Sequence, residues 1–454
     1  MYKFISICSL LFILSGAVVA RQSDSVAIAL SGSQDTLRWD EAITQGLENN
    51  YGIRLARTDA EVSETNYDYA KYAFFPTVDA NGVRTWTREE LTQRFSEQTD
   101  STEETIVVRN IPNARSNRLA YSVDASWRVF DGLGMFIAYD RLEALRDLSD
   151  LSVRATVENT AADIAELYHQ AIAQQSVLEV LINNVRLSQE RRDIAMFKYE
   201  VGKSSKQEYL QAQVQVNADS SNVLEQTAGL QAIKVDLNNL LARDPQTDFA
   251  VPSDIFLDSL PGLGDLQNRV VEENPNYQRS IHLEEVASFE KKAVRAERYP
   301  TVDLIASYNH AETESQGFFR GTESDGFTYG AQVNVPIFRR LDIRRREVVA
   351  DINMRTARLQ TEQLEQELLS QLQVAWIDYL NNRSLVVLER KNLAIARENA
   401  EIALDRYKLG NATPLESRQA QVNAVEAESR LISAIFNTKM AEISLKRISG
   451  TLLR

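Results

Sequence analysis

Cysteine and the usual catalytic motifs are nearly absent from this sequence. The single cysteine, Cys8, lies in an apolar N-terminal segment, so the chain can form no disulfide framework of its own. There is no nucleophile motif and no glycine-rich phosphate loop. The three histidines, His169, His282 and His310, lack the spacing of metal ligands. We therefore expect a protein that is not an enzyme and that holds no cofactor and no metal ion.

Proline, glycine and positive charge are also scarce. The chain has 9 prolines and 17 glycines among 454 residues, which favours long, uninterrupted elements. Lysine and arginine number 50 against 64 acidic residues, which gives a net charge of −14. A nucleic-acid-binding surface is normally basic, so this balance argues against a nucleic-acid partner.

Residues 1–20 have the order of a secretory signal peptide. Lys3 precedes an apolar run from Phe4 to Val19, and the small residue Ala20 follows. A retained membrane anchor is the competing interpretation, although the run is short for a span. After residue 20 no run of about 18 apolar residues occurs. We therefore expect an exported chain that is periplasmic, secreted, or placed in an outer membrane as a β-barrel.

One stretch of the sequence occurs twice, at residues 197–214 and 405–422. In each copy a glycine interrupts a long helical pattern and a helix start signal follows, which is typical of two helices joined by a tight turn. The offset between the copies is constant at 208 residues (407 − 199), and a repeat of this length predicts two similar halves. The matched positions are Tyr199 with Tyr407, Gly202 with Gly410, Glu208 with Glu416, and Gln211–Val214 with Gln419–Val422.

Each half is predicted to contain a helix, a β-hairpin and a long helical hairpin. The first repeat spans residues 21–243 and the second 266–454, and the proline- and glycine-rich segment 244–265 links them. The longest helices should extend on the order of 100 Å, which is typical of coiled coils and helical tubes. The predicted helices are residues 37–72, 133–199, 206–241, 265–299, 342–407 and 414–448.

Four stretches with a period of two predict strands. In the clearest, Leu119–Phe130, apolar and aromatic residues alternate with serine, aspartate and arginine. The others are Val78–Trp86, Val302–Asn309 and Phe327–Phe338. The polar residues Arg88–Arg118 between the first two strands are predicted to form a long exposed loop.

Strands with one apolar and one polar face suit the wall of a transmembrane barrel. About eight strands make the smallest known barrel, and an open edge in lipid leaves backbone groups unpaired. Four strands per chain therefore require several chains to share one barrel, and the count does not choose between two chains and three. The competing interpretation is a small soluble sheet packed on the helices. Aromatic residues near strand ends favour the membrane: Tyr121, Trp127, Tyr329 and Phe338.

The order and spacing of these features resemble the TolC-like outer-membrane efflux proteins. The resemblance covers essentially the whole chain after the signal, and it includes the helix entries Asn49-Asn50 and Glu273-Asn274-Pro275. It implies a mainly α fold with a β membrane part: a homotrimer with a twelve-stranded barrel among the lipids of the cell outer membrane and a long α-helical tube in the periplasm. The implied function is the passive exit duct of a tripartite efflux or type I secretion system. Its implied partners are a periplasmic adaptor (membrane fusion) protein and an inner-membrane pump.

The resemblance also assigns roles at the repeated turns. It implies a pore gate in which Glu416 and Glu208 narrow the pore, and Tyr407 matches the tip tyrosine of the family. Gln419 stands where a second acidic ring is expected, and Ala412 where a basic partner is expected. The turns themselves are implied to be the adaptor-docking tips: Val201, Gly202, Lys203, Leu409, Gly410 and Asn411.

Each of these assignments has a simpler alternative. Ser205 with Glu208, and Thr413 with Glu416, fit capping boxes, which stabilise a helix start and need no pore. The turns can equally be ordinary solvated turns. For the whole chain, the competing function is a soluble periplasmic coiled-coil scaffold or adaptor. Adaptors normally carry one helical hairpin, whereas this sequence predicts two of equal length.

Overall fold

The computed structural model describes residues 36–99, 103–316 and 320–453, and the predicted signal peptide lies outside them. Helices and strands follow in an order that occurs twice, which confirms the two-fold internal repeat and the mainly helical fold. The elements are α1 (Trp39–Asn49), α2 (Tyr51–Ala70), the 3-10 helix η1 (Lys71–Phe74), β1 (Thr77–Thr99), β2 (Glu103–Phe130), α3 (Gly134–Glu200), α4 (Lys206–Leu240), α5 (Leu263–Glu273), α6 (Pro275–Ala296), β3 (Thr301–Ser315), β4 (Gly321–Asn334), α7 (Asp342–Lys408) and α8 (Pro414–Ile448).

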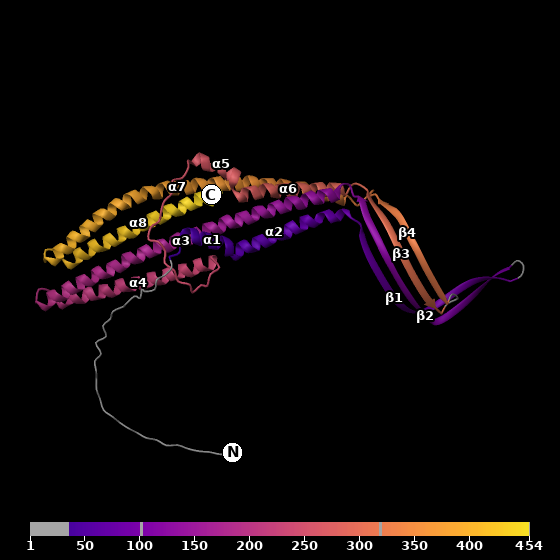
Figure 1. The fold of residues 1–454 in the computed structure, drawn as a ribbon, viewed down its shortest axis with the longest axis horizontal. Coiled ribbons are helices and arrows are strands. Elements are labelled where there is room, and N and C mark those ends of the chain that lie inside the picture. Colours follow the sequence, from indigo (N-terminus) through magenta and orange to yellow (C-terminus); the bar gives the residue numbers. More distant parts are fainter. Residues whose placement is uncertain (1–35, 100–102, 317–319, 454) are drawn as a thin grey trace, which may run out of the picture. The chain divides into compact units, whose positions relative to one another are not determined.

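The long helices match in length between the two repeats. α3 and α7 have 67 residues each, and α4 and α8 have 35 each. α3 packs against α4 and α8, and α8 packs against α7, so the order across this layer is α4, α3, α8, α7 (Figure 1). In the part of the chain that the structure describes, none of the helices combines the length and the apolar character needed to cross a membrane.

Two asparagines hold equivalent junctions in the two repeats. Asn50 caps the start of α2 and donates a hydrogen bond of 2.8 Å to the carbonyl of Leu240 at the end of α4. Asn274 caps α6 and donates a bond of 2.9 Å to the carbonyl of Ile448 at the end of α8. Each asparagine thus joins one helix start to another helix end. The cap at Asn50 divides the predicted helix 37–72 into α1 and α2.

The two largest clusters of buried core residues among the described residues lie midway along α3 and α7. One cluster, around Ile164 and Leu237, includes Phe249 from the segment between the repeats. The other, around Leu372 and Leu445, includes residues of α5. Ile164 and Leu372 are separated by the 208 residues of the repeat, as are Leu237 and Leu445. The two halves therefore bury equivalent faces.

The four strands form one antiparallel sheet in the order β1, β2, β3, β4, so β1 and β4 are its edges. β1 and β2 stay paired as far as Thr99 and Glu103. The prediction of an exposed loop over residues 88–118 was therefore wrong, because most of these residues extend the two strands. Backbone pairing needs no apolar side chain, so a polar hairpin end gives no hydrophobic alternation to detect.

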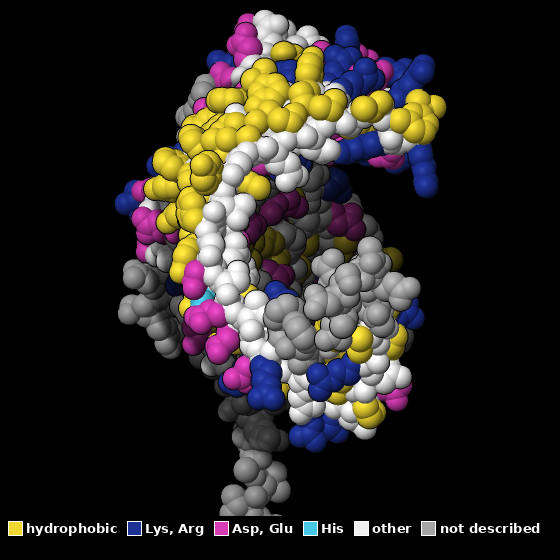
Figure 2. Space-filling view, turned by 90° about the vertical axis from the view of Figure 1, so that its right-hand side faces the viewer, with side chains coloured by type: hydrophobic (Ala, Val, Ile, Leu, Met, Phe, Trp, Pro, Cys, Tyr) yellow, Lys and Arg dark blue, Asp and Glu magenta, His cyan; other side chains and the backbone are white. Residues whose placement is uncertain are grey.

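The sheet has an apolar face in the part nearest the helices. Val123, Tyr308 and Phe327 are neighbours across β2, β3 and β4, and Phe327 is 66% exposed in the single chain. Figure 2 shows hydrophobic side chains gathered along the convex side of the curved sheet. The other face is polar: there the hydroxyl of Ser307 donates to the carboxylate of Asp124 at 2.5 Å. This division is what a barrel wall with an outward apolar face requires.

Candidate functional site at the helical tips

Each helical hairpin turns through a glycine in the left-handed conformation. The φ angle is +74° at Gly202 and +81° at Gly410, a region that strains residues with side chains. The N–H of Gly202 donates to the carbonyl of Tyr199, and that of Gly410 to the carbonyl of Tyr407, both at 3.0 Å. These bonds close the last helical turn. The predicted pair of tight turns is confirmed.

Each returning helix begins with a capped first turn. The Ser205 hydroxyl accepts from the N–H of Glu208 at 3.3 Å, and the Thr413 hydroxyl accepts from the N–H of Glu416 at 3.2 Å. A full capping box also returns the glutamate side chain to the start of the helix. Instead, the carboxylate of Glu208 accepts from Tyr407, and that of Glu416 pairs with an arginine of α7. The two carboxylates therefore bind partners on α7 and do not complete capping boxes.

A hydrogen bond between Tyr407 and Glu208 joins the two hairpins. Tyr407, in the last turn of α7, donates its hydroxyl to Oε1 of Glu208, in the first turn of α4, at 2.8 Å. The hydroxyl of Ser204 donates to the other carboxylate oxygen. Tyr407 is only 2% exposed. Burial is the main cause that raises the pKa of Tyr407 well above its ordinary value, and the hydrogen bond to Glu208 raises this pKa further. The hydroxyl therefore remains a donor at physiological pH.

A basic residue lies one helical turn before each turn glycine and contacts the neighbouring side chains at the tip. The Nζ atom of Lys198 donates to the carbonyl of Tyr407 at 2.7 Å and lies 3.8 Å from the centre of its ring. Arg406, the repeat equivalent of Lys198 (406 − 198 = 208), pairs with Glu416 at 3.0 Å. Both side chains of that pair are about half exposed, so it contributes little to stability. We call Tyr407, Glu208 and Lys198 the latch.

A buried polar cluster lies beside the latch. Nη2 of Arg191 donates to the hydroxyl of Ser188 at 3.1 Å, and that hydroxyl donates to Asp219 at 2.5 Å. Gln215 donates to the other oxygen of Asp219 at 2.9 Å. Burial lowers the pKa of Arg191. Arg191 and Tyr407 together line a cavity of about 110 Å³ between the four helix ends. A buried network of this kind fixes how α3 packs against α4 at this end of the first hairpin.

The structure separates the other predicted gate residues from the latch. Gln419 is exposed and donates to Asn423 one turn further along α8, at 3.0 Å. Ala412 has no polar side chain, and Arg406 supplies the basic partner of Glu416 from another position. Sequence reasoning missed Lys198 and Arg406, although both are basic, lie four residues before a turn glycine and share the repeat offset.

The two turns present apolar side chains to solvent. Leu409 is 76% exposed and Val201 is 49% exposed. Beside the first turn, an open groove of about 640 Å³ lies along α3 and is lined by Phe197 and Val201 together with charged side chains, among them Lys408. The six residues predicted for docking are all exposed: Val201, Gly202, Lys203, Leu409, Gly410 and Asn411.

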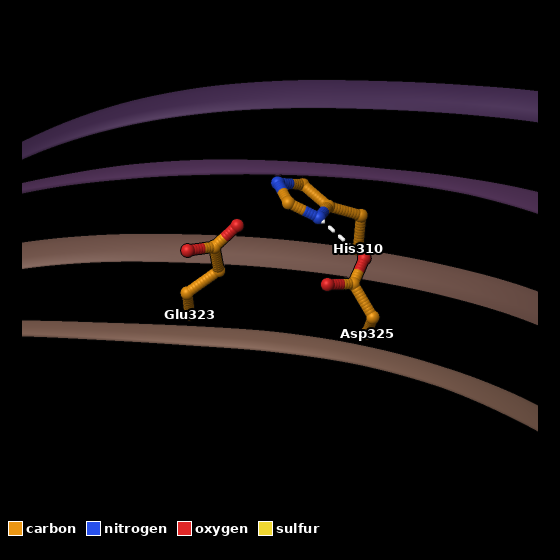
Figure 3. Close-up of side chains that lie close together, drawn as sticks. All are labelled: His310, Glu323 and Asp325. Carbon is orange, nitrogen blue, oxygen red and sulfur yellow. Dashed lines mark hydrogen bonds and ion pairs between the residues drawn. The ribbon is translucent and has the colours of Figure 1, made fainter.

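The sheet also brings together one group of side chains of the types that bind metals. Nδ1 of His310 on β3 lies 2.7 Å from Oδ1 of its cross-strand partner Asp325 on β4, with Glu323 beside them (Figure 3). One ligand atom from each residue lies within 4.8 Å of the others. Strand pairing creates this group, so the search for ligand spacing along the sequence missed it. Exposed carboxylates are often grouped without a metal, so the group alone assigns no function.

Comparison with known proteins agrees with the fold and the repeat. The family model described as outer membrane efflux protein matches residues 42–243 and 266–451. The chain is 22% identical over 441 residues to the probable efflux pump outer membrane protein TtgC of Pseudomonas putida, covering 94% of the chain and 87% of TtgC. It is 22% identical over 448 residues to the proteases secretion protein PrtF of Dickeya chrysanthemi, covering 94% and 91%.

The fold matches solved outer-membrane channels as well. The CmeC outer membrane channel of Campylobacter jejuni superimposes with a TM-score of 0.75 at 13% identity, covering 99% of this chain and 94% of CmeC. The family match spans both repeats, from the first helices to the end of α8. The chain therefore belongs to the outer membrane efflux protein family and is an exit duct of the outer membrane, not an enzyme.

Proposed function

We propose that three copies of this chain form one continuous channel, with a shared β-barrel in the outer membrane and a helical tube in the periplasm. One chain supplies four strands, and β1 and β4 have no further partner among the described strands. Three copies supply twelve strands, which closes every edge and lets the apolar face meet lipid. The two open edges of the sheet are the observation that carries this proposal.

The proposed partners are a periplasmic adaptor and an inner-membrane pump. The names of the relatives, an efflux pump outer membrane protein and a proteases secretion protein, support a duct that serves a tripartite efflux or type I secretion system. Exposed Val201 and Leu409, with the groove beside Phe197, offer the adaptor an apolar surface bordered by charge. The duct conducts passively, so the pump selects the substrate.

In this proposal the latch keeps the periplasmic end closed. It fastens the end of α7 to the start of α4, so an outward movement of either hairpin has to break the bond between Tyr407 and Glu208. A hydrogen bond to a charged group contributes about 1.5–3 kcal/mol net. Because about 1.4 kcal/mol is a factor of ten in an equilibrium constant, one such bond per chain biases the tips strongly toward closure.

Cell fractionation distinguishes the duct from a soluble periplasmic scaffold or adaptor. We expect the exported protein in the outer-membrane fraction, released only by detergent, with the mass of three chains. A protein that is soluble and monomeric without detergent would refute the duct.

Glu416 tests whether the tips also filter charge. Its carboxylate is 47% exposed and its partner Arg406 is 52% exposed, so the field of the carboxylate reaches the solvent. We expect Glu416→Gln to weaken the cation selectivity of the channel in planar bilayers, measured as the reversal potential in a salt gradient. The matched control is Glu426→Gln, further along the same helix. Unchanged selectivity in Glu416→Gln would leave Glu416 with only its ion pair to Arg406.

A further inference from the structure

The face of the sheet that is apolar near the helices becomes charged further along the strands. Successive residues of a strand alternate between the two faces, so Asp325 and Glu323 lie on the same face of β4 as Phe327. His310 on β3 lies on this face too, directly opposite Asp325. Charged side chains are costly on the lipid side of a barrel wall. In the proposed barrel this charged group therefore lies at the boundary of the membrane, where the apolar band ends.

Three side chains of this face converge within reach of one cation. One ligand atom from each of His310, Asp325 and Glu323 lies within 4.8 Å of the other two. Nδ1 of His310 is 2.7 Å from Oδ1 of Asp325, and Figure 3 shows the carboxylate of Glu323 turned toward the same ring. Ligand atoms around a tetrahedral Zn²⁺ ion are about 3.4 Å apart, because each lies about 2.0–2.2 Å from the ion. Both carboxylates are exposed, so small rotations bring the three atoms to such distances.

Neighbouring aromatic residues hold His310 and Asp325 in place. The ring of Tyr121, on β2, stacks on the ring of His310 with 4.5 Å between their centres. The side chain of His310 is only 12% exposed. The hydroxyl of Tyr308 donates to Oδ1 of Asp325 at 3.3 Å. Two of the three side chains are thus oriented before a cation arrives, which favours binding.

The group also carries negative charge that the sheet does not compensate. Glu312 lies directly opposite Glu323 across β3 and β4, and both are exposed. Like charges directly opposite each other destabilise a pair of strands. Within residues 36–99, 103–316 and 320–453, neither glutamate has an ion-pair partner. A bound divalent cation would supply the missing positive charge and join β4, an edge of the sheet, to β3.

We propose that His310, Asp325 and Glu323 form a binding site for a divalent transition-metal ion, of which Zn²⁺ is the best match. An imidazole nitrogen suits first-row transition metals, whereas Mg²⁺ and Ca²⁺ prefer oxygen ligands. Three protein ligands leave the fourth position of a tetrahedral ion open to water. The ion takes the place of the proton that His310 and Asp325 share. All three residues belong to one chain, so the site does not depend on the trimer proposed above.

Metal titration of the purified protein tests this site. The full exported chain in detergent is freed of metal with a chelator, which is then removed, and is titrated with Zn²⁺ by calorimetry. A parallel titration uses Co²⁺, whose visible absorption reports tetrahedral coordination. The only cysteine, Cys8, lies in the predicted signal peptide, so no thiolate competes for the ion. We expect Zn²⁺ to bind and Co²⁺ to give the absorption of a tetrahedral site.

Substitution of a ligand should weaken binding. Loss of a residue that only orients a metal ligand costs about 10–100-fold in affinity, so His310→Gln and Glu323→Gln should each weaken Zn²⁺ binding by at least about tenfold. Glu323 forms no hydrogen bond or ion pair with another described residue, so Glu323→Gln leaves the fold undisturbed. Zn²⁺ should also raise the melting temperature of the natural protein more than that of either variant, because the site exists only in the folded chain.

Two control variants define the comparison. His282→Gln removes an exposed histidine of α6 whose Nδ1 lies 3.4 Å from Glu285, a second place where an imidazole and a carboxylate meet. Glu89→Gln removes an exposed carboxylate of β1. Both should bind Zn²⁺ as the natural protein does. The assembled mass of every variant is measured before titration, so a failure to fold is seen directly.

The outcomes separate the metal site from the trimer. Undiminished Zn²⁺ binding in both His310→Gln and Glu323→Gln overturns the site, and so does binding that is lost in His282→Gln. A natural protein that binds neither Zn²⁺ nor Co²⁺ overturns the site as well. A monomeric protein whose Zn²⁺ binding requires His310 and Glu323 would refute the trimer and leave the metal site standing.

Discussion

Residues that the repeat makes equivalent have different environments. Tyr407 is buried and donates to Glu208, whereas Tyr199 is 42% exposed. The sequence predicted both turns and, through resemblance, a role for Tyr407. It could not predict which tyrosine is buried, because burial depends on how one hairpin packs on the other and not on local spacing. The Arg191 and Asp219 cluster was missed because neither residue falls within the repeated stretch.

The protonation of one buried histidine should make stability depend on pH. His169 is 9% exposed, and burial lowers the pKa of His169 from 6.5 to about 4. As the pH falls from about 6.5 to about 4, the histidine binds a proton in the unfolded chain but not in the folded chain. The free energy of unfolding should therefore decrease by roughly 3 kcal/mol between about pH 6.5 and pH 4.

The variant His169→Gln tests this dependence. Glutamine retains a donor for the carbonyl of Ala165, which lies 2.7 Å from Nδ1 of His169, but does not titrate. Thermal unfolding in detergent should show a smaller loss of stability toward acid in this variant than in the natural protein. His282→Gln, at a more exposed position, serves as the matched control. If the stability of His169→Gln falls as steeply toward acid as that of the natural protein, His169 is not the origin of the acid sensitivity.

At the scale of elements, the helices were predicted more closely than the strands. The expected helices 133–199 and 342–407 correspond to α3 and α7 almost residue for residue, because a period of 3.6 over many turns leaves little freedom. β4 was predicted to continue to Phe338 but ends at Asn334. Pro336 follows and has no N–H for a strand partner. The fold was thus predictable where side chains set the pattern and less so where the backbone did.

The segment between the repeats is held to α8 by a buried ion network. Glu442 is fully buried and accepts from Lys439 at 2.9 Å, from Lys446 at 3.0 Å and from the N–H of Asp258 at 3.0 Å. The hydrogen bond from Lys446, together with the charge of Lys439, holds the pKa of Asp258 well below its usual range. The network fixes this segment against α8.

Removing the charge of Glu442, at the centre of this network, should destabilise the folded protein. We expect Glu442→Gln to destabilise the protein by roughly 3–5 kcal/mol, because it leaves Lys439 buried without a full counter-charge. Glu426→Gln, on the same helix and paired at 4.0 Å with exposed Arg430, should change stability by less than about 1 kcal/mol. Denaturant unfolding measures both variants. Equal effects of the two substitutions would show that the buried network adds no stability.

At the scale of the whole molecule, the sheet of one chain is incomplete. It leaves β1 and β4 as edges among the described strands and exposes an apolar face. In the proposed trimer, neighbouring copies of the chain pair with both edges, and the apolar face meets lipid.

The most direct test of the gate is single-channel conductance in planar bilayers. Tyr407→Phe removes only the hydroxyl that donates to Glu208, and Tyr209→Phe removes a nearby hydroxyl that is not part of the latch. Losing about 1.5–3 kcal/mol per chain should shift the equilibrium toward the open state by at least about tenfold. We predict a larger conductance for Tyr407→Phe than for the natural channel, and a natural value for Tyr209→Phe. Equal conductance of Tyr407→Phe and the natural channel would contradict the claim that this hydrogen bond holds the tips closed.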